Sequence, residues 1–175
     1  IVESADSGNL DAQVDVMTRR MLALTWMMPP LIFPRSLQIS RTLRAMAERG
    51  WETTAIAVPP AVEGLAAQDS GLAAFYESSY RLLSVEPREE VAPSPFWLRL
   101  SRAVLRAKNP TILYWKRRAT GVLIRQVLEG RPDVFVSFAQ PWIIHVVALR
   151  VKRRFPDLPW VAHFSDPWVD SPYFN

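Results

Sequence analysis

The stretch RPDVFVSFAQPWIIHVVALRVKRRFPDLPWVAHFS, residues 131–165, holds two short apolar segments on either side of a helical pattern. Residues 134–138 and 160–164 are apolar and rich in β-branched and aromatic side chains, as is typical of parallel strands buried on both faces. The apolar positions between them recur at helical spacing and are Ile144, Val147, Ala148 and Val151. The stretch therefore predicts a strand–helix–strand crossover, which is right-handed in nearly all α/β proteins.

The beginning of the chain predicts a second unit of the same kind. Residues 21–26 and 51–58 are expected to be buried strands, with an amphipathic helix between them that Ser36 caps and Gly50 ends. The remaining elements expected are a short helix at 72–76, a strand at 81–85, and helices at 96–108 and 111–129. The alternation predicts an α/β fold: a Rossmann-like parallel sheet of about five strands, flanked by helices.

Length and composition favour one globular domain at residues 19–175, preceded by a disordered leader at residues 1–18. The sequence contains no cysteine, which excludes disulfides, thiolate zinc sites and cysteine nucleophiles and fits a reducing, cytoplasmic location. The two histidines, His145 and His163, are too few for a usual zinc site, so no metal is expected.

A basic block runs from Val91 to Leu128 without one acidic residue. Its cations are Arg99, Arg102, Arg106, Lys108, Lys116, Arg117, Arg118 and Arg125. Three interpretations stay open: the Arg99–Arg118 region meets an anionic membrane surface from the cytoplasmic side, it is a solvated helix face, or it contacts nucleic acid. No nucleic-acid-binding module is visible, so no nucleic acid is expected as partner.

Ligands of parallel α/β sheets bind at the carboxyl ends of the strands, which directs attention to residues 139–142 and 165–173. We expect His145 and Asp166 to take part in catalysis, as hydrogen-bond donor and as orienting group or base. The expected substrate-binding residues are Arg35, Ser36, Gln140, Trp142, Trp168, Asp170 and Tyr173. Each has a structural alternative: a core histidine, a turn aspartate, a surface arginine or a packing aromatic.

The segment PDVFVSFAQPWIIHVVALRVKRRFPDLPWVAHFSDPWVDSPY, residues 132–173, resembles the N-terminal domain of family-4 glycosyltransferases, and its DPW-x-D-x-PY ending carries most of that resemblance. The segment TWMMPPLIFPRSLQISRTLRAMAERGWETTAIAV, residues 25–58, is similar to the first strand, loop, helix and second strand of that family. The resemblance departs at residues 31–34, where many relatives carry glycines, and at His163 and Ser165.

This resemblance implies the acceptor-side half of a GT-B enzyme that transfers a sugar with retention, and without a metal, from a nucleotide-sugar to a glycan or lipid-linked acceptor. The family's second domain, which holds the nucleotide-sugar, has no counterpart in these 175 residues. We therefore expect the chain to be inactive alone and that missing C-terminal domain to be its partner. The alternative is a non-enzymatic Rossmann-like module that docks to an anionic membrane or to a partner protein.

Overall fold

The computed structural model describes residues 18–60, 67–86, 110–139 and 141–165, with side chains from residue 115 onward in the third range. Its strands are β1 (Arg19–Leu24), β2 (Trp51–Ala57), β3 (Arg81–Ser84), β4 (Val134–Phe138) and β5 (Trp160–His163). Its helices are α1 (Pro34–Ala47), α2 (Ser70–Tyr76), α4 (Pro110–Gly130) and α5 (Ile143–Arg154). The helix expected at 96–108 and the disordered leader expected at 1–18 lie outside the described residues, apart from Thr18.

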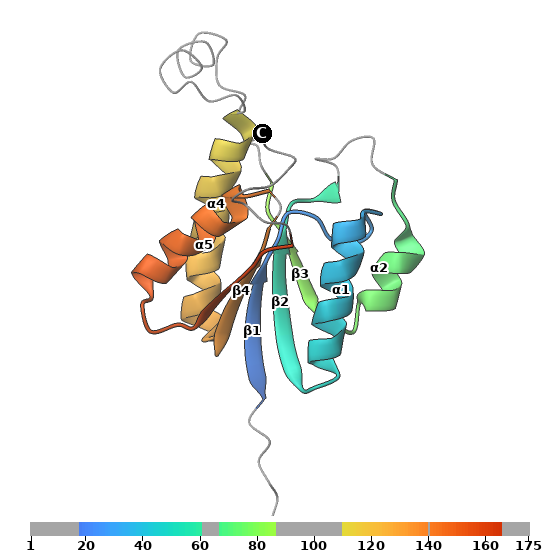
Figure 1. Ribbon diagram of the computed structural model, residues 1–175, viewed down its shortest axis with the longest axis horizontal. Coiled ribbons are helices and arrows are strands. Elements are labelled where there is room, and N and C mark those ends of the chain that lie inside the picture. Colours follow the sequence, from blue (N-terminus) through green and yellow to red (C-terminus); the bar gives the residue numbers. More distant parts are fainter. Residues whose placement is uncertain (1–17, 61–66, 87–109, 140, 166–175) are drawn as a thin grey trace, which may run out of the picture.

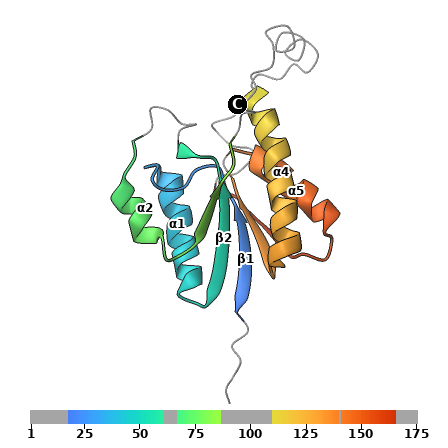
Figure 2. The same cartoon turned by 180° about the vertical axis from the view of Figure 1, so that it is seen from behind.

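The strands form one parallel sheet in the order β3-β2-β1-β4-β5, which confirms the predicted α/β, Rossmann-like architecture. Strand β1 lies in the centre, where Met21 aligns with Thr53 of β2 and with Val134 of β4. Helices α1 and α2 lie on one side of the sheet, and α4 and α5 lie on the other (Figure 1 and Figure 2). The fold is thus a three-layer α/β/α sandwich.

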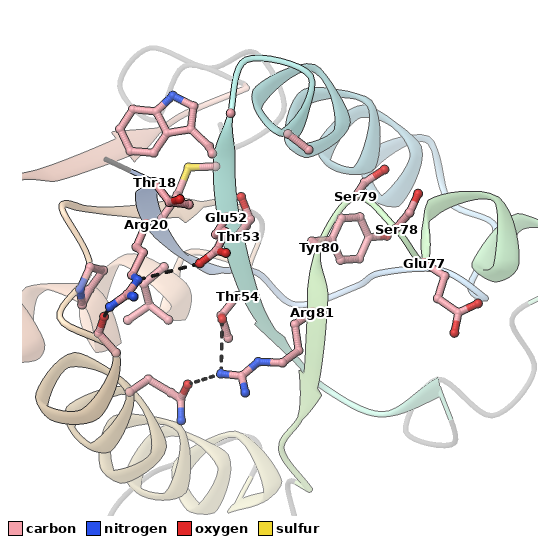
Figure 3. A pocket seen from close by; sticks show the side chains of 18 residues that line it. Thr18, Arg20, Glu52, Thr53, Thr54, Glu77, Ser78, Ser79, Tyr80 and Arg81 are labelled. Carbon is pink, nitrogen blue, oxygen red and sulfur yellow. Dashed lines mark hydrogen bonds and ion pairs between the residues drawn. The ribbon is translucent and has the colours of Figure 1, made fainter. Parts of the chain in front are cut away.

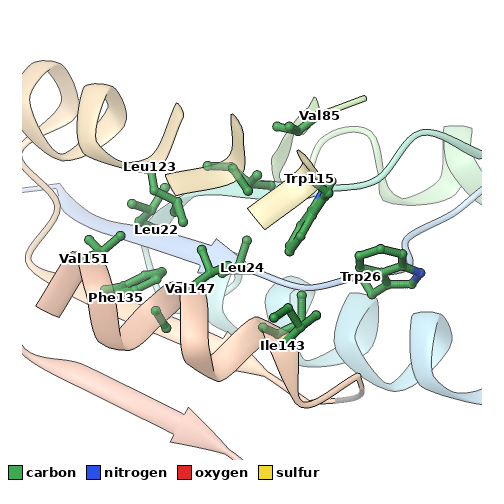
Figure 4. Packing of buried hydrophobic residues seen from close by; sticks show 14 of the residues in the cluster. Leu22, Leu24, Trp26, Val85, Trp115, Leu123, Phe135, Ile143, Val147 and Val151 are labelled. Carbon is green, nitrogen blue, oxygen red and sulfur yellow. The ribbon is translucent and has the colours of Figure 1, made fainter. Parts of the chain in front are cut away.

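Alternation along β1 divides the core into two layers. Leu22 and Leu24 point toward α4 and α5, where they pack with Trp115, Phe135 and Val147 (Figure 4). The neighbouring residues of β1, Met21 and Ala23, pack in a smaller cluster under α1; other members of this cluster are Ile39, Leu43 and Phe138. Burial on both faces explains why residues 21–24 of β1 are all apolar.

The turn between α1 and β2 has the predicted chemistry. Gly50 has a φ of 81°, in the left-handed region that glycine adopts without steric cost. The end of the helix and the direct entry into β2 are therefore explained by this residue. No helix in the described parts of the chain is long and apolar enough to span a bilayer.

Candidate functional site

The order of the strands creates a switch point between β1 and β4. The chain leaves β1 through α1 toward β2 on one face, and it leaves β4 through α5 toward β5 on the other face. The connections diverge at the carboxyl ends of these two strands, and ligands of doubly wound sheets bind in the crevice that results. The first turns of α1 and α5 border this edge, and they carry Arg35 and His145.

His145 lies in the first turn of α5 and is buried, with 6% of its surface exposed. Its Nδ1 is 2.8 Å from the hydroxyl oxygen of Ser137 in β4. Its ring packs against that of Phe164, with centroids 4.4 Å apart. The imidazole is thus held between the strand before α5 and the strand after it.

The surroundings of His145 favour its neutral form. Burial is the main cause that lowers the pKa of His145 below its ordinary value, and electrostatic interactions with Arg35 and His163 lower it further. A hydrogen bond to the backbone of His163 acts in the opposite direction. The ring is therefore expected to be uncharged at neutral pH.

This lowered pKa predicts acid sensitivity. Because the unfolded chain binds a proton at His145 more tightly than the folded chain, stability is greatest above the unfolded pKa of about 6.5 and is lost as the pH falls through the folded value. We expect His145→Gln to remove this part of the pH dependence. Urea unfolding of both proteins between about pH 7.5 and 5 measures it, and parallel curves for the two proteins would contradict it.

Arg35 reaches across the same edge to β5. Its Nη2 lies 3.3 Å from Nδ1 of His163, and its Nη1 lies 3.5 Å from the side-chain oxygen of Gln38. The ring of His163 is exposed, faces Arg35 and packs on Phe138, with ring centroids 5.3 Å apart. Arg35, His145 and His163 therefore form one electrostatically coupled group, which we call the basic cluster.

Ser36 differs from the prediction in its local role. The helix begins earlier than expected, at Pro34, so Phe33 is the N-cap and Ser36 is the third helical residue. The fully buried Ser36 hydroxyl accepts a hydrogen bond from the Phe33 backbone N–H at 3.2 Å and lies 2.6 Å from the Leu31 carbonyl oxygen. Its substrate-binding role stays a prediction, but the loop between β1 and α1 depends on this hydroxyl.

Ser36→Ala should therefore destabilise the domain. Two backbone groups lose their partner in a buried turn, and such a loss costs about 1–3 kcal/mol in the free energy of unfolding. Ser36→Thr retains the hydroxyl and is expected to lose less. Urea unfolding measures both, and an alanine variant as stable as the parent would contradict the described turn.

The other predicted site residues are only partly placed. Trp142 is the N-cap of α5 and is 60% exposed at the carboxyl edge of the sheet, where its indole is available to a ligand. Gln140, Asp166, Trp168, Asp170 and Tyr173 lie outside the described residues. Their predicted roles in catalysis and binding stay predictions.

Within the described ranges, no three histidine or acidic side chains gather in a way that could hold a metal ion. The expectation that neither metal nor other cofactor takes part stays a prediction. The chemistry available from the basic cluster is hydrogen-bond donation and attraction of negative charge.

A large pocket, of about 850 Å³, lies at the opposite, amino-terminal edge of the sheet (Figure 3). Arg81 of β3 donates hydrogen bonds there to Thr54 at 3.4 Å and to Gln126 at 2.9 Å. Arg20 is 3.8 Å from Glu52 in an exposed ion pair. Neither Arg35 nor His145 lines this pocket, so it is separate from the switch point.

Solved structures of similar shape include Phytolacca americana UGT2 complexed with UDP-2-fluoro-glucose and pterostilbene, with a TM-score of 0.50 and 10% identity over 86% of this chain and 31% of that one. The chain has a Rossmann-like fold. A glycosyltransferase from Rickettsia africae gives a TM-score of 0.48 at 8% identity, over 90% of this chain and 32% of that one. The C-terminal domain of a hydrogenase from Pyrococcus furiosus also gives a TM-score of 0.48, at 10% identity, over 84% of this chain and 92% of that one.

No protein-family model matches the sequence, and no curated protein matches it either. At 10% identity the likeness to the Phytolacca enzyme establishes a shared fold. The chain spans about a third of the length of the two transferases, 31% and 32%. The shared fold therefore covers only part of the Phytolacca protein.

Proposed function

We propose that this chain is the acceptor-binding, N-terminal portion of a retaining glycosyltransferase of family 4. The enzyme would move a sugar from a nucleotide-sugar to a glycan or to a lipid-linked acceptor. The observation that carries the proposal is the position of Arg35 and His145. They lie in the two segments whose sequences resemble that family. At the switch point of the sheet, the charge of Arg35 contributes to lowering the pKa of His145.

In this proposal the residues of the chain divide the work of holding an acceptor. His145 donates a hydrogen bond to an acceptor oxygen, and Asp166 orients the acceptor hydroxyl or takes its proton. Arg35 attracts the negative charge of a phosphate group. Trp142, with Trp168 and Tyr173, supplies aromatic surface on which a sugar ring stacks. The nucleotide-sugar would be held by a second domain encoded downstream.

The test is to produce the chain together with the segment that its gene encodes after Asn175 and to supply a panel of nucleotide-sugars. We expect the longer protein to release nucleoside diphosphate in the presence of an acceptor, and residues 1–175 alone to release none. A stop codon directly after Asn175 would contradict the proposal. So would a longer protein that transfers no sugar from any donor.

A second candidate is a non-enzymatic module that docks to an anionic membrane. The observation that favours it is the exposed basic side of α4, which presents Arg117, Arg118 and Arg125. Basic side chains near an anionic bilayer each contribute about 1 kcal/mol to binding. The rest of the Arg99–Arg118 region lies mainly outside the described residues, so the described part of α4 carries this candidate.

If this second candidate is correct, the chain binds vesicles rich in phosphatidylserine and salt weakens the binding. Replacement of the three α4 arginines by glutamine removes about 3 kcal/mol, which is about a 100-fold loss of affinity. Arg150, Arg153 and Arg154 of α5 are exposed too, and their replacement is the charge-matched control. Vesicle co-sedimentation measures the affinity, and equal binding to neutral vesicles at high salt would rule out the basic side of α4.

A further inference from the structure

A chain of hydrogen bonds behind the switch point ends on His145. The indole Nε1 of Trp160, in β5, lies 2.8 Å from the hydroxyl oxygen of Ser137 in β4. The same oxygen lies 2.8 Å from Nδ1 of His145 in α5. Ser137 is fully buried, so this hydroxyl has no access to water. Three consecutive elements of the fold are joined by one serine oxygen.

The direction of these hydrogen bonds follows from which groups can only donate. An indole N–H cannot accept, so Trp160 donates to Ser137. The serine then has one hydrogen of its own to place, and His145 Nδ1 is the only acceptor within reach among the described residues. A buried hydroxyl hydrogen without an acceptor is unfavourable, so Ser137 donates to Nδ1.

We infer that Ser137 and Trp160 are positioning residues that hold His145 as a neutral imidazole with its hydrogen on Nε2. A protonated Nδ1 would compete with the Ser137 hydroxyl hydrogen and leave one of the two without an acceptor.

The charged and titratable groups around the His145 ring also favour its neutral form. Within the described residues, Arg35 at the start of α1 and His163 at the end of β5 oppose protonation of the ring. The rings of His163 and Phe138 pack together, while that of His145 packs on Phe164. These surroundings therefore favour the neutral imidazole.

The tautomer of His145 follows from its hydrogen bonds alone, whereas the role of its Nε2–H toward a ligand rests on the proposed function. A histidine whose Nδ1 lone pair already accepts from Ser137 cannot act as a base through that nitrogen. It presents a hydrogen-bond donor at Nε2, which suits an acceptor or phosphate oxygen. Specificity for an oxygen ligand at this position would therefore originate in two residues, Ser137 and Trp160, that do not themselves touch the ligand.

The test is ¹⁵N nuclear magnetic resonance of the histidine side chains in the full 175-residue chain. In the parent protein we expect Nδ1 of His145 in the range of an unprotonated imidazole nitrogen and Nε2 in the range of a protonated one. His145→Gln assigns the signal. A protonated Nδ1 in the parent protein would overturn the inference, and this measurement requires no substitution of Ser137 or Trp160.

Variants of the network provide the second arm. Ser137→Ala should shift both nitrogen signals toward the average of two exchanging tautomers, whereas Ser137→Thr, which retains a hydroxyl, should restore the parent spectrum. Trp160→Phe removes the obligatory donor and should give an intermediate result. The matched control is Ser40→Ala: Ser40 is also fully buried and also bonded to an aromatic side chain, Tyr80, at 3.0 Å.

An unchanged His145 spectrum in folded Ser137→Ala would also overturn the inference. The two proposals fail separately in these experiments. If the longer protein transfers no sugar but the spectra are as expected, the proposed function is wrong and the positioning role of Ser137 stands. If the longer protein transfers sugar but His145 of the parent protein has its hydrogen on Nδ1, the proposed function stands and the positioning role of Ser137 is wrong.

Discussion

Trp115→Ala is expected to lower the free energy of unfolding by about 3–5 kcal/mol, the usual cost of deleting a large aromatic side chain from a core. Trp115 has no exposed surface and lies edge-on to Trp26, with ring centroids 4.9 Å apart. It fills the space between α4 and the carboxyl half of the sheet (Figure 4). Since small domains are stable by only about 5–15 kcal/mol, this variant should be close to unfolding under mild conditions.

Two further variants make the result specific. Trp115→Phe should lose much less, because it keeps a ring and removes an indole N–H that has no hydrogen-bond partner among the described residues. Leu128→Ala, on the same helix at 62% exposure, should change stability by less than about 0.5 kcal/mol. Urea unfolding measures all three. A loss below about 1 kcal/mol in Trp115→Ala would show that this part of α4 does not pack on the sheet as described.

The second large effect concerns sugar transfer by the longer protein. His145→Ala is expected to reduce kcat/KM by about 10²–10³, the usual effect of removing one hydrogen-bond donor to charge that develops in a reaction. His145→Gln places an amide donor near the position of Nε2 and should lose less. Asp166→Ala is also expected to lose transfer. Nucleoside diphosphate release at several acceptor concentrations separates kcat from KM.

Burial of His145 requires a stability control in the same experiment. Its ring touches Phe164 and its Nδ1 meets Ser137, so His145→Ala also weakens packing. The proposal predicts lost transfer at temperatures where the variant is still folded by circular dichroism. Full activity in both His145→Ala and Asp166→Ala would refute the assignment of these two residues. Activity that falls only as the protein unfolds would identify His145 as a structural residue.

Much of the fold could be predicted from sequence because local patterns dictate it. The apolar segment at 134–138 forms a strand over the predicted residues, since turn residues border it on both sides. Gly50 ends α1 in the left-handed conformation, as predicted. The start of α1 was predicted too late, because Pro34 at the first helical position determined it rather than Ser36 as the cap.

The parts that could not be predicted depend on contacts between distant residues. Nothing in the sequence of β1 indicates that β2 and β4, rather than β5, are its neighbours. The role of Ser137 could not be predicted, because a single serine within an apolar strand does not indicate a hydrogen-bond partner. Its partners, Trp160 and His145, approach it only in the folded structure. The exposure of His163 in β5, an edge strand, is likewise a property of the assembled sheet.

The central place of β1 also sets an order for assembly during synthesis. Arg19 pairs with Trp51 across 32 positions (51 − 19), whereas Met21 pairs with Val134 across 113 (134 − 21). Closing the longer loop costs about 1 kcal/mol more in chain entropy, so β1, α1 and β2 should assemble first. At about 5–20 residues per second, the ribosome needs several seconds to proceed from β2 to β4. Throughout that interval one edge of β1 has no partner, and it is then that the nascent chain is most open to aggregation and to chaperones.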